Sequence, residues 1–171
     1  MIIWLIGLSG AGKTTVGTRL AARLRADHPN LVYLDGDLVR EVWGGTLTHD
    51  IEGREVNAAR LSRLCRMLDR QGVHVVAAVL SIFPQWRAWN RENLSSYFEV
   101  FLDLPLEVAM ARDTKGLYRA ALRGDTHDVV GVNIPFPRPA EADLVLDSSG
   151  RHGSPDQLVE EILAALPKAG S

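Results

Sequence analysis

Residues 7–15 read GLSGAGKTT, and this stretch constrains the fold of the chain more than any other feature. It satisfies the pattern G-x-x-x-x-G-K-[ST], in which glycines let backbone N–H groups turn inward toward phosphate oxygens. An apolar run at 2–6 precedes it, and a helical pattern of Val16, Leu20 and Leu24 follows it. A strand, a glycine loop and a helix in that order predict a site for the phosphates of a nucleoside triphosphate.

The residues expected to hold these phosphates share this loop and the first turn of its helix: Gly7, Ser9, Gly10, Ala11, Gly12, Lys13, Thr14 and Thr15. In the chemistry that accompanies the pattern, the lysine reaches the β- and γ-phosphates and the hydroxyl of Thr14 binds Mg²⁺. The sequence therefore predicts that the chain binds a nucleoside triphosphate together with Mg²⁺.

Length and composition predict one domain that spans residues 1–171. The apolar content of 46% and charged content of 23% are typical of a soluble globular protein. A net charge of −2 gives no electrostatic support for a nucleic-acid partner. No apolar stretch is long enough for a membrane span, and no leader pattern precedes the first apolar run, so we expect a cytoplasmic protein without a membrane partner.

Five apolar runs alternate with helical patterns along the chain. The runs lie at 2–6, 31–34, 73–79, 98–102 and 144–146. This alternation predicts an α/β fold of three layers, a five-stranded parallel sheet with helices on both faces. Ligands of such sheets bind beyond the carboxyl ends of the strands.

One long segment, at about 112–139, interrupts this alternation with several glycines and prolines. It contains five cations, Arg112, Lys115, Arg119, Arg123 and Arg138. A long irregular insertion in a compact domain is usually functional, so we interpret this segment as a lid over the phosphates. The alternative interpretation is a solvated surface loop.

Two acidic residues, Asp35 and Asp37, directly follow the second apolar run, and Arg40 stands three residues further on. A carboxylate at a strand end near a triphosphate can hold Mg²⁺ or accept a proton from an attacking hydroxyl. Gly36 between them allows the backbone to approach a ligand. Alternatively, Asp37 is the N-cap of a helix that starts near Leu38, and the two interpretations are compatible.

Arg54 and Asn57 stand near the start of a predicted long helix and share one of its faces. A guanidinium and an amide suit an anionic substrate with polar edges, but an arginine-rich solvated face has the same spacing. The spacing alone does not choose between these interpretations.

Ser81 and Phe83 follow the third apolar run. The serine suits either a hydrogen bond to a phosphate or a cap on the turn, and the phenylalanine suits either stacking on a flat substrate ring or core packing. Trp86 and Trp89, at helical spacing, favour a place in the core.

Together these motifs resemble the adenylylsulfate kinases. The shared segments are the glycine loop, DGD-x-x-R at 35–40, R-x-x-N at 54–57, ARDTKGLY at 111–118 and GVNIPFPRP at 131–139. The resemblance implies a P-loop nucleoside-kinase-like fold, ATP and Mg²⁺ as cofactors, and transfer of the γ-phosphate to the 3′-hydroxyl of adenylylsulfate. It also implies a homodimer, in which we do not expect contacts through the N-terminal extension that many members carry.

The resemblance assigns a role to each matching residue. Lys13, Asp35 and Ser81 are then catalytic, Thr14 and Asp35 bind the metal, and Arg112 and Lys115 contact the nucleotide. The residues implied for acceptor binding are Asp37, Arg40, Arg54, Asn57, Ile82, Phe83, Lys115, Gly116, Leu117 and Phe136.

Three segments depart from the family pattern, at 44–49, 53–57 and 80–85, and all three fall on the acceptor side. The first departure removes the aromatic residue expected to stack on the adenine of adenylylsulfate. The sequence LSIFP and the later NRENLSSYFEVF are more similar to a divergent branch that resembles cytidine diphosphoramidate kinase of capsule modification. Adenylylsulfate is the default acceptor, and a cytidine nucleotide is the alternative.

Two other classes of protein share the glycine loop. A regulatory GTPase switch needs a base-reading N-K-x-D element, and the sequence contains none. An inactive nucleotide-binding scaffold would not need Lys13, Thr14 and Asp35, which are all present. These observations favour a kinase over both.

Overall fold

The computed structural model describes residues 1–44, 47–113, 115–151 and 153–167. Gly45, Thr46 and Thr114, which belong to segments discussed above, lie outside these ranges. Five strands form one parallel sheet in the order β2-β3-β1-β4-β5. The strands are β1 (Ile2–Ile6), β2 (Val32–Asp35), β3 (Val75–Val79), β4 (Tyr97–Asp103) and β5 (Leu144–Asp147). The predicted parallel sheet is therefore confirmed.

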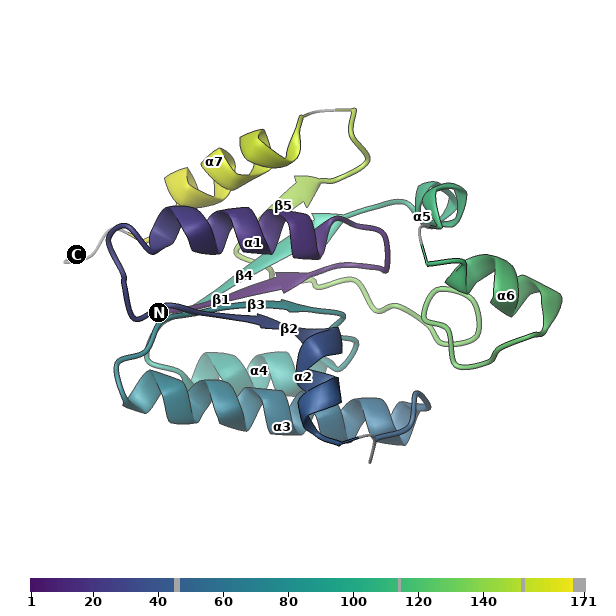
Figure 1. The fold of residues 1–171 in the computed structure, drawn as a ribbon, viewed down its shortest axis with the longest axis horizontal. Coiled ribbons are helices and arrows are strands. Elements are labelled where there is room, and N and C mark those ends of the chain that lie inside the picture. Colours follow the sequence, from purple (N-terminus) through teal and green to yellow (C-terminus); the bar gives the residue numbers. More distant parts are fainter. Residues whose placement is uncertain (45–46, 114, 152, 168–171) are drawn as a thin grey trace.

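Helices cover both faces of the sheet (Figure 1). One face carries α1 (Lys13–Leu24) and α7 (Pro155–Ala165), and the other carries α3 (Ile51–Arg70) and α4 (Pro84–Asn93). Three short helices follow the carboxyl ends of strands or lie beyond them: α2 (Gly36–Val42), α5 (Leu106–Arg112) and α6 (Leu117–Arg123). The three-layer α/β architecture predicted from the alternation is confirmed.

The central strand β1 explains why the apolar runs are continuous. All five of its residues are buried. Ile3 and Leu5 pack into the cluster beneath α1 and α7, whereas Ile2, Trp4 and Ile6 pack into the cluster beneath α3. Each fully buried aliphatic side chain stabilises the fold by about 1.5–3 kcal/mol. Because both faces of the sheet are covered, alternate residues are equally apolar and no polar face interrupts the run.

The segment at 112–139 is not wholly irregular, so this part of the prediction is wrong. Helix α6 occupies its middle, between Gly116 at φ 66° and Gly124 at φ 78°. The buried carboxylate of Asp113 accepts hydrogen bonds from the backbone N–H groups of Tyr118 and Arg119 at 3.0 Å, which satisfies two free donors of the helix start. The glycines flank the helix, where positive φ is needed, and do not interrupt it.

Two local predictions also need correction. Helix α2 is capped by Asp35 and not by Asp37, because Asp35 Oδ1 accepts the backbone N–H of Asp37 at 3.0 Å. The helix therefore begins at Gly36. Trp86 and Trp89 are only partly buried. Instead of lying in the core, each ring lies under a guanidinium group of α3, whose central carbon is 5.1 or 5.6 Å from the ring centroid.

Among the described residues, no helix has the length and apolar character needed to cross a membrane.

Candidate active site

The carboxyl ends of the central strands open onto a cavity of about 1260 Å³. Its wall combines the glycine loop, α2, the start of α3, the loop after β3 and the segment beyond α6. Most of the predicted site residues line it: Ser9, Gly10, Gly12, Lys13, Thr14, Thr15, Asp35, Asp37, Arg40, Arg54, Asn57, Ser81, Ile82, Phe83, Lys115 and Leu117. The parallel topology therefore brings together motifs that are up to about a hundred residues apart in sequence.

The glycine loop owes its shape to close packing and positive φ angles. A Cβ atom on Gly7 would lie 2.8 Å from the carbonyl oxygen of Leu102, so only glycine allows β4 to approach this closely. Gly12 has φ 84° and precedes α1 directly. The first residues of this helix line the cavity, where their unpaired backbone N–H groups suit a phosphate.

Lys13 is held against its own loop. Its Nζ donates hydrogen bonds to the carbonyl oxygens of Gly7 and Leu8, both at 2.8 Å. Desolvation lowers the pKa of Lys13 to about 8, although the neighbouring charge of Asp37 acts in the opposite direction. The ammonium group therefore loses its proton closer to neutral pH than an ordinary lysine does.

Thr14 and Asp35 form the pair that suits Mg²⁺. Thr14 Oγ1 donates to Asp35 Oδ2 at 2.8 Å, and the hydroxyl of Tyr33 donates to the same oxygen at 3.1 Å. Mg²⁺ takes oxygen ligands and usually combines one or two protein groups with water and substrate phosphates. The described residues contain no cluster of three or more His, Cys, Asp or Glu that could hold a metal without such help. A hydroxyl and a carboxylate beside the phosphate loop fit this ion.

Two arginines lie at the other end of the cavity. The guanidinium of Arg40 donates to the carbonyl oxygen of Thr48 at 2.8 Å, and that of Arg54 donates to the carbonyl oxygen of Asp128 at 2.7 Å. Desolvation lowers the pKa of both groups, yet both stay charged at neutral pH. These contacts hold the cations in place, so this end of the cavity suits an anion.

Lys115 lines the cavity and contacts a second lining residue, Asp37. Its Nζ contacts Asp37 Oδ2 at 2.5 Å, which links the segment before α6 to α2. Burial opposes the effect, but the hydrogen bond and charge of Lys115 hold the pKa of Asp37 below its usual value. The same hydrogen bond raises the pKa of Lys115. Both groups therefore stay charged across the neutral range.

Several cavity residues escaped the sequence-based prediction, among them Trp4, His49 and Asp128. Desolvation, followed by the charges of Arg40 and Arg54, lowers the pKa of His49, so its ring is neutral at pH 7. None of the three belongs to a spaced motif. Trp4 is hidden in an apolar strand, and His49 and Asp128 reach the cavity only because of tertiary packing.

Five predicted residues do not line this cavity: Gly7, Ala11, Arg112, Gly116 and Phe136. Gly7 and Ala11 belong to the glycine loop but do not face the cavity. Arg112 donates to the carbonyl oxygens of Gly10 and Ser148 at 3.1 and 3.0 Å, so it braces the outer side of the loop.

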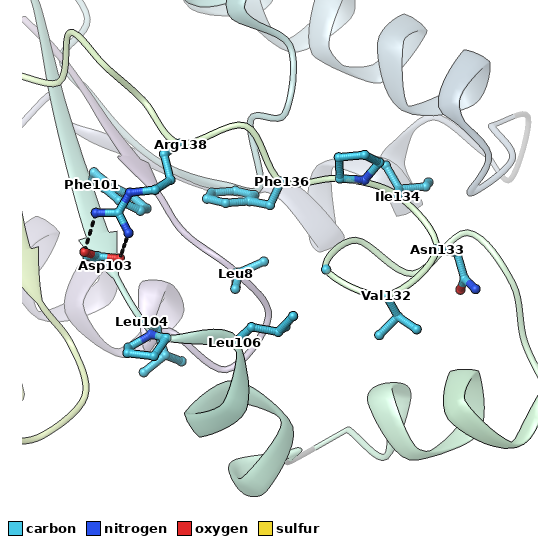
Figure 2. Close-up of a pocket in the computed structure, with 13 residues that line it drawn as sticks. Leu8, Phe101, Asp103, Leu104, Leu106, Val132, Asn133, Ile134, Phe136 and Arg138 are labelled. Carbon is cyan, nitrogen blue, oxygen red and sulfur yellow. Dashed lines mark hydrogen bonds and ion pairs between the residues drawn. The ribbon is translucent and has the colours of Figure 1, made fainter.

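Phe136 lies instead in a second cavity of about 360 Å³, where its ring stacks on Phe101 with centroids 5.9 Å apart. Figure 2 shows this cavity, together with the two hydrogen bonds between Arg138 and Asp103. Phe136 therefore lines a different cavity from most of the other residues implied for the acceptor.

A doubly wound parallel sheet, a G-x-x-x-x-G-K-[ST] loop before α1, and a Thr–Asp pair at the strand ends define a P-loop kinase. The adenylylsulphate kinase family model matches residues 1–147. The chain belongs to that family and is an ATP-dependent phosphotransferase with an alcohol group as acceptor, a nucleotide kinase of the adenylylsulfate kinase type. The family uses ATP with Mg²⁺, as the resemblance implied.

Similar proteins carry two different names. The cytidine diphosphoramidate kinase of Campylobacter jejuni subsp. jejuni serotype O:2 is 39% identical over 96% of this chain and 95% of its own length. The adenylyl-sulfate kinase of Paraburkholderia xenovorans is 39% identical over 86% of this chain and 83% of its own. Among solved structures, the APS kinase CysC of Mycobacterium tuberculosis in complex with AMPPNP and APS has a TM-score of 0.85 at 31% identity, covering 96% of this chain and 95% of that one.

Proposed function

We propose that this chain transfers the γ-phosphate of ATP to a ribose hydroxyl of a second, small nucleotide. One observation carries the proposal: a single cavity has the phosphate loop at one end and two positioned arginines at the other. Its volume of about 1260 Å³ exceeds the roughly 300–1,000 Å³ typical of a site for one small ligand. That volume suits a donor and an acceptor nucleotide held end to end.

At the donor end, Lys13 would neutralise the β- and γ-phosphates after leaving the carbonyl oxygens of Gly7 and Leu8. Mg²⁺, held by Thr14 and Asp35, would supply further positive charge to the transferring phosphoryl group. The helix-start N–H groups of α1 would bind the β-phosphate oxygens. These groups favour charge that builds up during transfer, which is the main contribution a kinase can make.

At the reacting centre, the acceptor oxygen forms a bond to the γ-phosphorus while the bond from that phosphorus to the β,γ-bridging oxygen breaks. The hydroxyl proton must leave during this step. Asp35 lines the cavity beside the phosphate loop, where it accepts the hydroxyl of Thr14, so its carboxylate is our candidate to orient the acceptor hydroxyl or receive the proton. Lys115, in the lid segment, would add charge over the phosphates, and lid closure would exclude water.

Adenylylsulfate is the acceptor that family membership supports. The adenylylsulphate kinase model spans most of the chain, and the solved relative with a TM-score of 0.85 contains APS. On this proposal the product is 3′-phosphoadenylylsulfate, and Arg40 and Arg54 bind the anionic end of the acceptor.

A cytidine nucleotide, such as cytidine diphosphoramidate, is the second candidate. The relative of that name matches the chain along nearly its whole length. In addition, the described part of the segment at 44–49 lines the cavity with Gly44, Leu47 and His49, and offers no benzene or indole ring for stacking on a purine. A smaller base suits such a wall.

An ATP-consumption assay with Mg²⁺ separates the two candidates. The acceptor panel contains adenylylsulfate, cytidine diphosphoramidate and the simple cytidine, uridine and guanosine nucleotides. Turnover of one acceptor at a kcat/KM of about 10⁴ M⁻¹s⁻¹ or more, the ordinary range for enzymes, assigns it. ATP hydrolysis that no member of the panel accelerates would contradict a nucleotide acceptor.

We also propose that residues 1–171 form a single domain and that the protein is a homodimer. Light scattering coupled to size exclusion measures the mass against the 18.8 kDa of one chain. Domain number is tested by the cooperativity of urea unfolding, because a single domain gives one transition.

A further inference from the structure

We propose that Trp4 and Arg87 are positioning residues that hold Ser81 so that its hydroxyl donates a hydrogen bond to the acceptor nucleotide. The inference rests on the proposed function, because it assigns the residues that fix the geometry of the acceptor end of that cavity. Neither Trp4 nor Arg87 belongs to a motif. Trp4 lines the cavity beside Ser81, and Arg87 lies behind the cavity wall.

The backbone of Ser81 is unusual. Its φ of 54° lies in the left-handed region, which residues other than glycine rarely adopt and which costs backbone energy. Ser81 stands just after β3 and lines the cavity together with Ile82 and Phe83. A strained serine persists at such a place only when neighbouring groups hold it.

Trp4 holds the side chain of Ser81. Its indole Nε1 donates to Ser81 Oγ at 3.0 Å across 77 residues of sequence. An indole N–H can only donate, so the serine oxygen is the acceptor in this pair and keeps its own proton. No described residue accepts that proton. The hydroxyl is therefore free to donate into the cavity that Ser81 lines.

Arg87 holds the main chain of Ser81. The side chain of this arginine, on α4, is buried, and its guanidinium donates to the carbonyl oxygen of Ser81 at 2.8 Å. Its Nε lies 3.5 Å from Oε1 of Glu99, a buried carboxylate on β4 whose Oε2 accepts the hydroxyl of Tyr97 at 2.8 Å. Since buried arginines need such partners, Glu99 keeps the guanidinium in place beneath the loop.

Together the two contacts restrain Ser81 from two different elements on the same face of the sheet. One comes from β1 through the hydroxyl oxygen, and the other comes from α4 through the carbonyl oxygen. A donor restrained in this way loses little freedom when it binds an anionic oxygen, which is how a rigid site gains affinity. The acceptor nucleotide supplies such oxygens in its phosphate groups.

The test is a double-mutant cycle with Trp4→Phe and Ser81→Ala, measured on the acceptor that the panel assay identifies. Each single variant should lower kcat/KM for the acceptor about tenfold, the effect of losing a hydrogen bond to a charged group, and should change the KM for ATP less than about twofold. The double variant should be no worse than Ser81→Ala alone, because Trp4 acts through that serine. Trp89→Phe, a tryptophan outside the cavity, should match the wild type. Additive losses would overturn the proposal.

A readout that needs no acceptor keeps the outcome clear if Trp4→Phe folds poorly or the panel shows no turnover. The chain has four tryptophans, so a ¹⁵N spectrum gives few indole signals, and Trp4→Phe identifies one of them. Ser81→Ala should shift the Trp4 indole signal and leave that of Trp89 unchanged. An unmoved Trp4 signal would refute the positioning role. Absence of turnover with every acceptor would instead contradict the proposed function, and the indole signals would still decide this inference.

The role of Arg87 has its own test. Arg87→Lys keeps a cation that can donate to the carbonyl oxygen of Ser81, whereas Arg87→Gln does not keep the charge that pairs with Glu99. The lysine variant should therefore retain at least about three times more acceptor kcat/KM than the glutamine variant, with the KM for ATP unchanged in both. Equal losses in the two variants, or a matching rise in the KM for ATP, would remove Arg87 from the proposal.

Discussion

The two ends of the large cavity are built in different ways. Most of the donor end comes from one continuous stretch, 7–15, in a single strand–loop–helix unit, to which Asp35 and Lys115 add charged groups. The acceptor end is assembled from α2, α3, the loop after β3 and the segment beyond α6. A local unit keeps its geometry wherever it occurs, whereas an assembled wall changes when any one element changes. This difference explains why the donor nucleotide follows from a motif and the acceptor does not.

The largest expected effect tests the donor end. Lys13→Ala should lower kcat by about 10³-fold or more with every acceptor, because the lysine serves the phosphates that all acceptors share. Arg19→Ala, on the same helix but paired with the exposed Asp156, is the control and should stay near the wild type. Steady-state kinetics measure both. Near-normal turnover by Lys13→Ala would contradict the role of the loop.

The second largest expected effect tests whether the donor and acceptor nucleotides bind to different ends of the cavity. Arg54→Ala should raise the KM for the acceptor about 10- to 100-fold and change the KM for ATP less than about threefold, since a charge-assisted hydrogen bond is lost only at the acceptor end. Arg70→Ala, in the last turn of the same helix, provides the comparison. If both KM values rose equally, the division of the cavity into two ends would fail.

The pH dependence of kcat/KM for ATP tests the role of Lys13 at the donor end. Because the pKa of Lys13 is lowered to about 8, the free enzyme loses this ammonium charge as pH rises through that value. The kcat/KM for ATP should then fall about tenfold per pH unit above pH 8. Lys13→Arg, whose side chain stays charged, should show a flatter fall over pH 7–9.5. Identical profiles for the two proteins would assign the fall to another group.

The smallest expected effect is on stability and concerns the ion pair between Asp37 and Lys115. Asp37→Asn removes an exposed ion pair with Lys115, so the free energy of unfolding should fall by only about 0–1 kcal/mol at pH 7. The pKa of Asp37 is lowered in the folded protein, so its contribution is present above the unfolded pKa and is lost as pH falls through the folded pKa. The difference between wild type and variant in the free energy of unfolding by urea should therefore shrink as the pH falls below the range where an ordinary aspartate titrates. A constant difference would point to another cause.

Several predictions from the sequence depended on strong local patterns and agree with the structure. The five apolar runs became five parallel strands with small shifts at their ends, because strands buried on both faces leave a continuous apolar signal. Asp35 illustrates a weaker case. Its place at a strand end was predictable, but its capping of α2 was not, since Asp35 and Asp37 offer the same side chain to the start of one helix.

Other features of the structure could not be predicted from spacing along the chain. The resemblance implied that Phe136 contacts the acceptor, and in the structure its ring stacks on Phe101 and lines the smaller cavity. Trp4 was hidden among apolar neighbours, yet its one polar atom reaches Ser81. The spacing of residues along the chain predicts which side chains share one face of a helix or strand. It does not predict which distant residues that face contacts.

By itself, the sequence determined the phosphate loop, the parallel sheet and the edge of the sheet at which ligands bind. These follow from interactions within about twenty residues, such as glycine conformations, helix periodicity and continuous apolar runs. Only the tertiary structure decided which of the predicted acceptor residues share one cavity, where Phe136 lies, and how Trp4 and Arg87 hold Ser81. Those outcomes depend on contacts between residues far apart in the chain, and packing of the whole core sets such contacts.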